Sequence, residues 1–242
     1  MSYDVRYDTA EMDAFAADAA ADERVAFLRR VYAHLGGATL LFAGLATAIL
    51  STPALAQPLA RLAAGHWWVV LVAYIGAGWV AQRMAESNTS EAVQYAGLAL
   101  FALAQAVIFT PLLYMLHEIV PGGDDVIIQA GLLTLTVFGG LTAVALFSRT
   151  DFSFLRGMLS LGMLIALGLA ITAAFTQLNL GTWFVVAMIG LMAGYILYET
   201  SNVLHHYHTS QHVAASLALF ASLTTLFWYV LRLTSYLNLG DD

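Results

Sequence analysis

Long runs of apolar residues, separated by short polar stretches, dominate the chain. Because an arginine or acidic side chain costs about 2.5 to 3.5 kcal/mol at the centre of a bilayer, charged residues are expected to mark the connections between membrane spans. A helix needs about 20 apolar residues to cross the hydrocarbon core. On these two criteria the sequence predicts seven transmembrane helices, at residues 31–50, 66–82, 92–117, 126–148, 157–175, 182–199 and 213–237.

The fifth and sixth spans are read from one uncharged stretch between Arg156 and Glu199. As one helix it would be about 63 Å long, roughly twice the hydrocarbon thickness, so the polar run TQLNLGT at residues 176–182 is expected to divide it. Pro53 and Pro58 suit a connection after the first span. Open sheet edges find no partners in lipid, and the alternation of a membrane β-barrel is missing, so the fold class is an all-α polytopic bundle.

Composition supports a single membrane domain preceded by a short tail. Hydrophobic residues make up 60% of the 242 residues and charged residues 10%, against about 25% in a soluble domain. Seven acidic residues stand within residues 1–23, which argues against a signal peptide. We therefore expect a mobile, acidic cytosolic tail over residues 1–26 and one transmembrane domain over residues 27–242.

The arginines predict the orientation. The predicted loops lie alternately on the two sides of the membrane, and one side carries only Arg61. The positive-inside rule places the other, arginine-rich side in the cytosol. The N-terminus is then cytosolic and the C-terminus outside, in the inner (plasma) membrane. The arginines on the cytosolic side are Arg24, Arg29, Arg30, Arg83, Arg149 and Arg156.

Several classes of function are not expected. The chain has no cysteine, which excludes disulfides, thiolate catalysis and iron–sulfur ligation. It also lacks the HExxH, GxSxG and P-loop motifs and any pair of carboxylates at catalytic helical spacing, so an enzyme is not predicted. With a formal charge of −7, nucleic acid is not a plausible ligand. No cofactor is expected, and the lipid bilayer is the expected surrounding.

Glu199 closes the sixth span in the run YILYETSNVLHHYH. A carboxylate at the hydrocarbon boundary loses water that stabilises its charge, which makes it a candidate proton sensor or cation ligand. A helix-end glutamate that reaches into cytosolic water is the alternative. Asn202 and His206 follow at i+3 and i+7, on the same face of a continued helix.

Four histidines follow this span. The spacings between His205, His208 and His212 would align three imidazoles on one helix face, which suits a transition metal or a pH-dependent contact, and His206 lies beside them. No acid or cysteine shares that register. A solvated cytosolic loop is the simpler interpretation, and no firm metal site is predicted.

The seventh span is the most polar, which predicts a position inside the bundle. Its hydroxyls can bond across helices or line a wet path. Arg232, near the end of the span, can reach outward to water or pair with a buried acid. The hydroxyl residues concerned are Ser216, Ser222, Thr224 and Thr225.

The run TLTVFGGLTAVALFSRTDFSFLRGML at residues 134–159 resembles the signature of the Bax inhibitor-1/YccA family. The segments FLRRVYAHL (27–35), IFTPLLYML (108–116) and YILYETSNVLHHY (195–207) extend the resemblance over nearly the whole chain from residue 27. The resemblance implies seven helices with the seventh enclosed by the other six. Members of the family are described as pH-sensitive calcium leak channels, suppressors of stress-induced death, or modulators of a membrane-anchored AAA protease.

Channel-like members of the family use two facing aspartates. Aligned on the motifs, the first falls on Glu199 and the second on Ser222, so one carboxylate of the pair is missing. Two close carboxylates titrate as a coupled pair, and a single glutamate does not. The combination of Glu199 in the sixth span with Ser222 in the seventh is more similar to the YccA branch of the family.

The resemblance therefore implies regulation of proteolysis in membrane-protein quality control or the stress response. A membrane-anchored AAA protease is the expected partner, and the acidic tail is the segment for it to engage. The alternative is a pH-sensitive leak for Ca²⁺ or another cation, with H⁺ as the regulator. In that alternative Glu199 is the gating acid, Ser222 and Thr225 face it, and Arg232 is its counter-charge.

Overall fold

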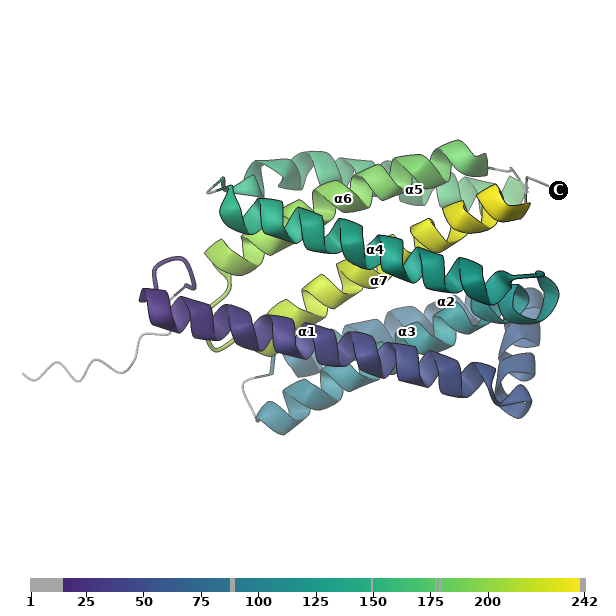
Figure 1. Cartoon of the computed structure of the whole chain (residues 1–242), viewed down its shortest axis with the longest axis horizontal. Coiled ribbons are helices and arrows are strands. Elements are labelled where there is room, and N and C mark those ends of the chain that lie inside the picture. The colour runs from purple at the N-terminus through teal and green to yellow at the C-terminus, as the bar shows by residue number, and fades with distance from the viewer. Residues whose placement is uncertain (1–14, 88–89, 149, 177, 179, 240–242) are drawn as a thin grey trace, which may run out of the picture.

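The computed structural model describes residues 15–239, apart from residues 88–89, 149, 177 and 179. Its described part is helical, with seven helices long and apolar enough to cross a membrane, which confirms the predicted fold class (Figure 1). Arg149 and residues 1–14, used above for orientation and for the tail, lie outside the described residues. The helices are α1 (Ala21–Leu50), α2 (Pro53–Ala85), α3 (Glu91–Ile119), α4 (Gly123–Phe147), α5 (Leu155–Thr176), α6 (Gly181–His206) and α7 (His212–Leu239), with a short 3-10 helix η1 (Phe152–Phe154) before α5.

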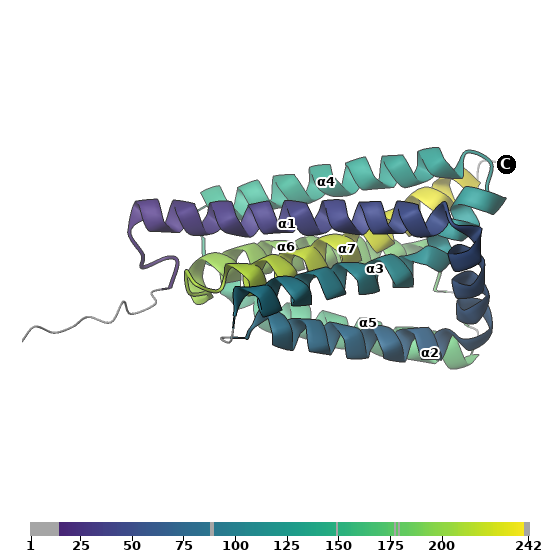
Figure 2. The ribbon, with the colours of Figure 1, turned by 90° about the horizontal axis from the view of Figure 1, so that it is seen from below.

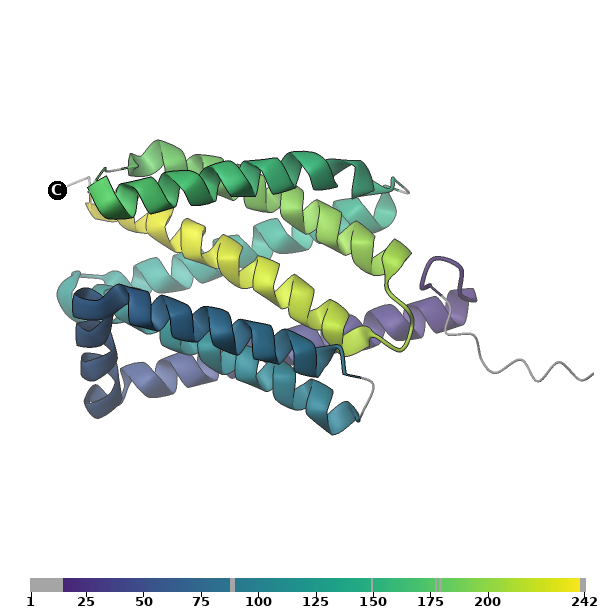
Figure 3. The same cartoon turned by 180° about the vertical axis from the view of Figure 1, so that it is seen from behind.

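Helix α7 runs obliquely through the bundle. Figure 3 shows it between α5 and α6 on one side and α2 and α3 on the other. It packs against α1, α2, α3, α4 and α6, and it is the most buried of the seven helices. That α7 is enclosed by all six of the other helices remains a prediction. The start of α1 and the end of α7 lie at opposite ends of the bundle, as an odd number of crossings requires (Figure 1).

Aromatic rings fill the contact between α1, α3 and α7. The ring centroid of Phe42 lies 5.2 Å from that of Phe109, and Phe109 stacks on Phe227 at 5.4 Å. Ring pairs of this kind contribute about 0.5 to 1.5 kcal/mol beyond the area they bury. The rings hold α7 against the first and third helices.

Buried polar bonds also tie α7 to its neighbours. The Gln105 amide nitrogen on α3 donates to Thr224 Oγ1 at 2.8 Å, and Ser216 Oγ donates to the Val31 carbonyl of α1 at 2.9 Å. Ser216 and Thr224 therefore have the packing role that the sequence offered for the hydroxyls of this span.

Residues 51–58, assigned from the sequence to a connection, are helical from Pro53 onward. Pro53 stands in the first turn of α2, where its missing N–H leaves no helical bond unmade. Pro58 removes one further backbone hydrogen bond. The helix then bends at His66, which has φ −140° and ψ 48°. As a result, the segment before His66 lies across the end of the bundle (Figure 2).

The described part of the tail also differs from the sequence expectation. Helix α1 begins at Ala21, ten residues before the predicted span at 31–50. Residues 15–20 fold back against the connection between α6 and α7, where Ala16 is completely buried. The alanine-rich composition predicted a mobile segment because alanine offers little apolar area. A small side chain such as that of Ala16 can nevertheless pack closely against a neighbouring segment.

Candidate functional site

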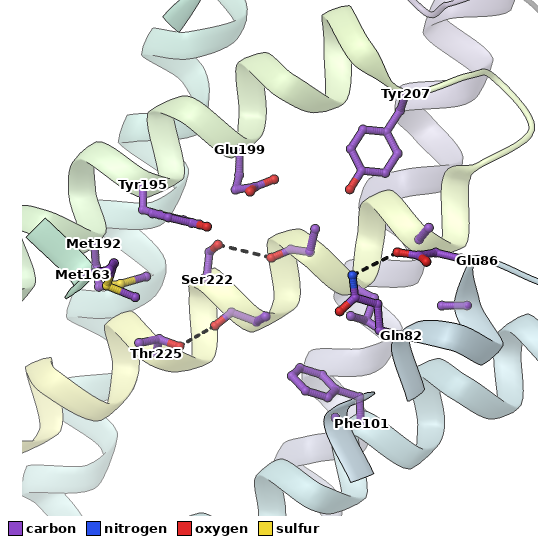
Figure 4. Close-up of a pocket in the computed structure, with 16 residues that line it drawn as sticks. Gln82, Glu86, Phe101, Met163, Met192, Tyr195, Glu199, Tyr207, Ser222 and Thr225 are labelled. Atoms are coloured by element: carbon purple, nitrogen blue, oxygen red, sulfur yellow. Dashed lines mark hydrogen bonds between the residues drawn. The ribbon is translucent and has the colours of Figure 1, made fainter. Parts of the chain in front are cut away.

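A cavity of about 380 Å³ lies between α2, α3, α5, α6 and α7. Its apolar lining includes Phe101, Met163 and Met192, and polar side chains reach it from α6, from α7 and from the end of α2 (Figure 4). The polar side chains that line it are Gln82, Glu86, Tyr195, Glu199, Tyr207, Ser222 and Thr225.

Glu199 lies within α6 and not at its end. The helix continues to His206, about two turns beyond the predicted boundary at residue 199. The Glu199 side chain is partly buried and faces the cavity, one turn after Tyr195 (Figure 4). Asn202 Nδ2 approaches Glu199 Oε2 at 3.5 Å, and no ion pair engages the carboxylate within the described residues. This placement favours the cavity over a helix-end role in open water.

Ser222 and Thr225 line the same cavity from α7, so the structure brings together three of the four residues that the sequence associated. Each hydroxyl donates to its own helix: Ser222 Oγ to the Ala218 carbonyl at 3.2 Å, and Thr225 Oγ1 to the Ala221 carbonyl at 2.7 Å. Since their protons are used in this way, the oxygen lone pairs remain available as acceptors in the cavity.

Arg232 is not brought to this cavity. It stands ten residues after Ser222, about 15 Å further along α7. Its guanidinium donates to Tyr236 Oη at 2.8 Å and lines a separate pocket with Phe184 and Tyr229. We therefore do not retain Arg232 as the counter-charge of Glu199.

The sequence analysis did not identify four polar residues of the cavity, Gln82, Glu86, Tyr195 and Tyr207. Gln82 Nε2 donates to Glu86 Oε1 at 2.9 Å, one turn apart at the end of α2. Tyr207 is the extended residue that follows α6, with φ −99° and ψ 140°. Burial raises the pKa of the Tyr207 phenol, and the charges of Glu199 and Glu86 raise it further, so the ring remains a neutral donor. The sequence signals were indirect: Tyr195 and Tyr207 begin and end the family-like run at residues 195–207, and Glu86 follows Arg83 by three residues.

The histidines at and after the end of α6 do not form the aligned row that their spacing suggested, because the helix ends at His206, before His208 and His212. His205 Nδ1 lies 2.9 Å from the Ser201 carbonyl, and the ring of His208 stacks on Phe15. His212 begins α7 and lies against His34, with ring centroids 5.1 Å apart. Among the residues that the structure describes, no three His, Cys, Asp or Glu side chains are close enough to hold a metal ion.

The donor set of the cavity consists of oxygens: two carboxylates, two phenols and two hydroxyls, with one amide. Hard cations such as Ca²⁺ prefer oxygen ligands and take six to eight of them. The donors lie on α2, α6 and α7 and on the residues just after α2 and α6, so an ion held by a few of them would need water or backbone carbonyls to complete its shell. The arrangement therefore suits weak or transient contact with a cation, or a proton-dependent rearrangement, more than tight binding.

Comparisons with known proteins cover nearly the whole chain. A protein-family model described as inhibitor of apoptosis-promoting Bax1 matches residues 24–240. An uncharacterized protein of Pseudomonas aeruginosa is 28% identical over 218 residues, 89% of this chain and 90% of the relative. The Escherichia coli protein named modulator of FtsH protease YccA is 34% identical over 116 residues, 48% of this chain and 52% of the relative. Bax inhibitor 1 of Schizosaccharomyces pombe is 32% identical over 122 residues, 48% of this chain and 45% of the relative.

Proposed function

The chain belongs to the Bax inhibitor-1 family, and from that membership we propose that it regulates a membrane-anchored AAA protease in membrane-protein quality control or the stress response. The observation that carries the proposal is the similarity to the Escherichia coli protein named as a modulator of the FtsH protease. That match spans about half of each chain. Ser222, which lines the cavity, stands where channel-like members of the family have their second aspartate, and this replacement also supports the YccA branch.

The proposal includes the orientation of the chain. Another Escherichia coli relative is named an inner membrane protein, which supports the same location for this chain. A cytosolic N-terminus would present the acidic tail to the AAA ring of the protease. Reporter fusions after Arg30, Arg149 and Asp242 test this orientation. A cytosolic reporter signal at Asp242 would contradict it.

The tail supplies the direct test. Deletion of residues 2–14 should lengthen the cellular lifetime of the protein, because the protease would lose its point of engagement. The chain should also co-purify with a membrane-anchored AAA protease. The matched control replaces residues 2–14 by an equally long Gly/Ser segment, which separates loss of sequence from loss of length. An unchanged lifetime together with no co-purified protease would contradict the proposal.

A second function is favoured by the cavity itself, in which Glu199 faces the hydroxyls of α7. We propose as the alternative a pH-sensitive leak for Ca²⁺ or another cation, with Glu199 as the gating acid. The oxygens are spread around the cavity on separate elements, so binding should be weak and the flux should saturate only at high ion concentration.

Calcium flux into proteoliposomes, measured across pH, tests this alternative. Glu199→Gln should abolish the pH dependence, and Ser222→Asp should strengthen it by restoring a carboxylate pair. Glu118→Gln is the matched control, since Glu118 does not line the cavity. If Glu199→Gln retains both the flux and its pH response, the role of Glu199 as the gating acid is refuted.

A further inference from the structure

The start of the described chain lies against the connection between α6 and α7, and three of the contacts between them are here called the clasp. The backbone N–H of Ala16 donates to the Tyr207 carbonyl at 3.0 Å. The ring of Phe15 stacks on His208 with centroids 4.4 Å apart. Thr209 Oγ1 donates to Glu23 Oε1 at 2.9 Å. The clasp therefore joins residues 15–23 to residues 207–209 by backbone, ring and side-chain contacts.

Tyr207 connects the clasp to the cavity. Its carbonyl accepts the hydrogen bond from Ala16, while its ring lines the cavity with Glu199 and Glu86. Figure 4 shows the Tyr207 ring directed into the space between α6 and the end of α2. Because Tyr207 lies beyond the last residue of α6, the helix does not fix its position, and contacts of the connecting segment determine where the ring lies.

We propose that the clasp holds the Tyr207 ring as a gate at one end of the cavity, and that withdrawal of the tail from residues 207–209 opens the cavity to water. The inference rests on the cavity as the functional site of the proposed functions, and it adds a means of control. A partner that pulls on the tail would thereby change the cavity. Each of the three clasp contacts is individually weak, so a pull on the tail can shift the equilibrium between the closed and open states.

The absence of cysteine from the natural sequence allows a direct measurement of access. Ser222→Cys places one thiol in the cavity, at a position where the native side chain is 3% exposed. The purified full-length protein in nanodiscs is treated with a small cationic methanethiosulfonate reagent, and the labelling rate is followed by mass spectrometry. No protease and no ion gradient are present, so the outcome is independent of both proposed functions.

Ala16→Pro is the variant that opens the clasp, because proline has no backbone N–H to donate to Tyr207. We expect labelling of the cysteine to become about tenfold faster, which corresponds to about 1.4 kcal/mol. Ala20→Pro is the matched control: residue 20 has φ −55°, which proline adopts, so labelling should stay at the parent rate.

Two further variants keep the test decisive. Tyr207→Ala removes the gate and should give fast labelling whether or not the clasp is formed. Thr209→Val removes the bond to Glu23 without a change in backbone, and should accelerate labelling even if Ala16→Pro does not fold. The inference is overturned if Thr209→Val and a folded Ala16→Pro both label at the parent rate, or if Tyr207→Ala does not accelerate labelling.

Discussion

The bond between Gln105 and Thr224 provides a quantitative test of how α7 is held in the bundle. Both side chains are 2% exposed, and Gln105 Nε2 lies 2.8 Å from Thr224 Oγ1 and 3.1 Å from Tyr74 Oη. Interhelical bonds of this kind in membranes average about 0.6 kcal/mol, with a maximum of about 1.7 kcal/mol. The bond is short and buried but shared with Tyr74, so we expect a coupling energy of about 1 kcal/mol.

A double-mutant cycle measures this coupling. The free energy of unfolding in bicelles is determined by steric trapping for the parent, Gln105→Leu, Thr224→Val and the double variant. Gln105→Leu with Thr134→Val is the control cycle. Thr134 is equally buried and, like Thr224, donates to a carbonyl of its own helix, at 2.7 Å to Ala130, but it does not bond to Gln105. The control should be additive within about 0.3 to 0.5 kcal/mol. A coupling energy between Gln105 and Thr224 that is also within about 0.3 to 0.5 kcal/mol of zero would refute the claim that this polar contact holds α7 against α3.

Two further predictions concern stability. A Cβ at Gly97 would lie 2.6 Å from the Ala81 carbonyl of α2, so Gly97→Ala should destabilise the protein by about 1 to 3 kcal/mol in the same assay. Gly140→Ala meets no atom within 4 Å and should not. Hydrogen bonds from the side chain and then the backbone of Ser153 lower the pKa of Asp151, so its ionised form stabilises the fold above about pH 4, and that stability is lost as the pH falls further. The melting temperatures of the parent and Asp151→Asn should therefore differ at pH 6 and converge on acidification; a constant difference would contradict this reasoning.

The number and type of helices could be predicted because charge is expensive in lipid. That rule locates the spans but not the helix ends. Helix α1 starts at Ala21 and α6 continues to His206 because helical hydrogen bonding does not stop where the hydrocarbon does. Pro53 was assigned to a connection, but it stands in the first turn of α2. A proline can mark either the break between two helices or the first turn of one, and the sequence does not distinguish the two.

The candidate site could be predicted only in part. Glu199 was identified as a carboxylate at the end of the sixth span, the family resemblance paired it with Ser222, and both residues line the cavity. Glu86 and Tyr207 were missed, because their roles depend on which helix ends meet, and no pattern within one helix encodes that. The clasp depends on contacts between residues nearly 200 positions apart, so neither periodicity nor composition could reveal it.

Reconstitution with a protease tests the proposed function most directly. The purified chain and a membrane-anchored AAA protease of the FtsH type are placed together in liposomes, and the degradation rate of a membrane substrate is measured as the chain is titrated. An unrelated seven-helix membrane protein serves as the control. The account predicts a change in rate that saturates with the amount of chain and does not occur with the control. A degradation rate that stays constant up to a molar excess of intact chain would contradict it.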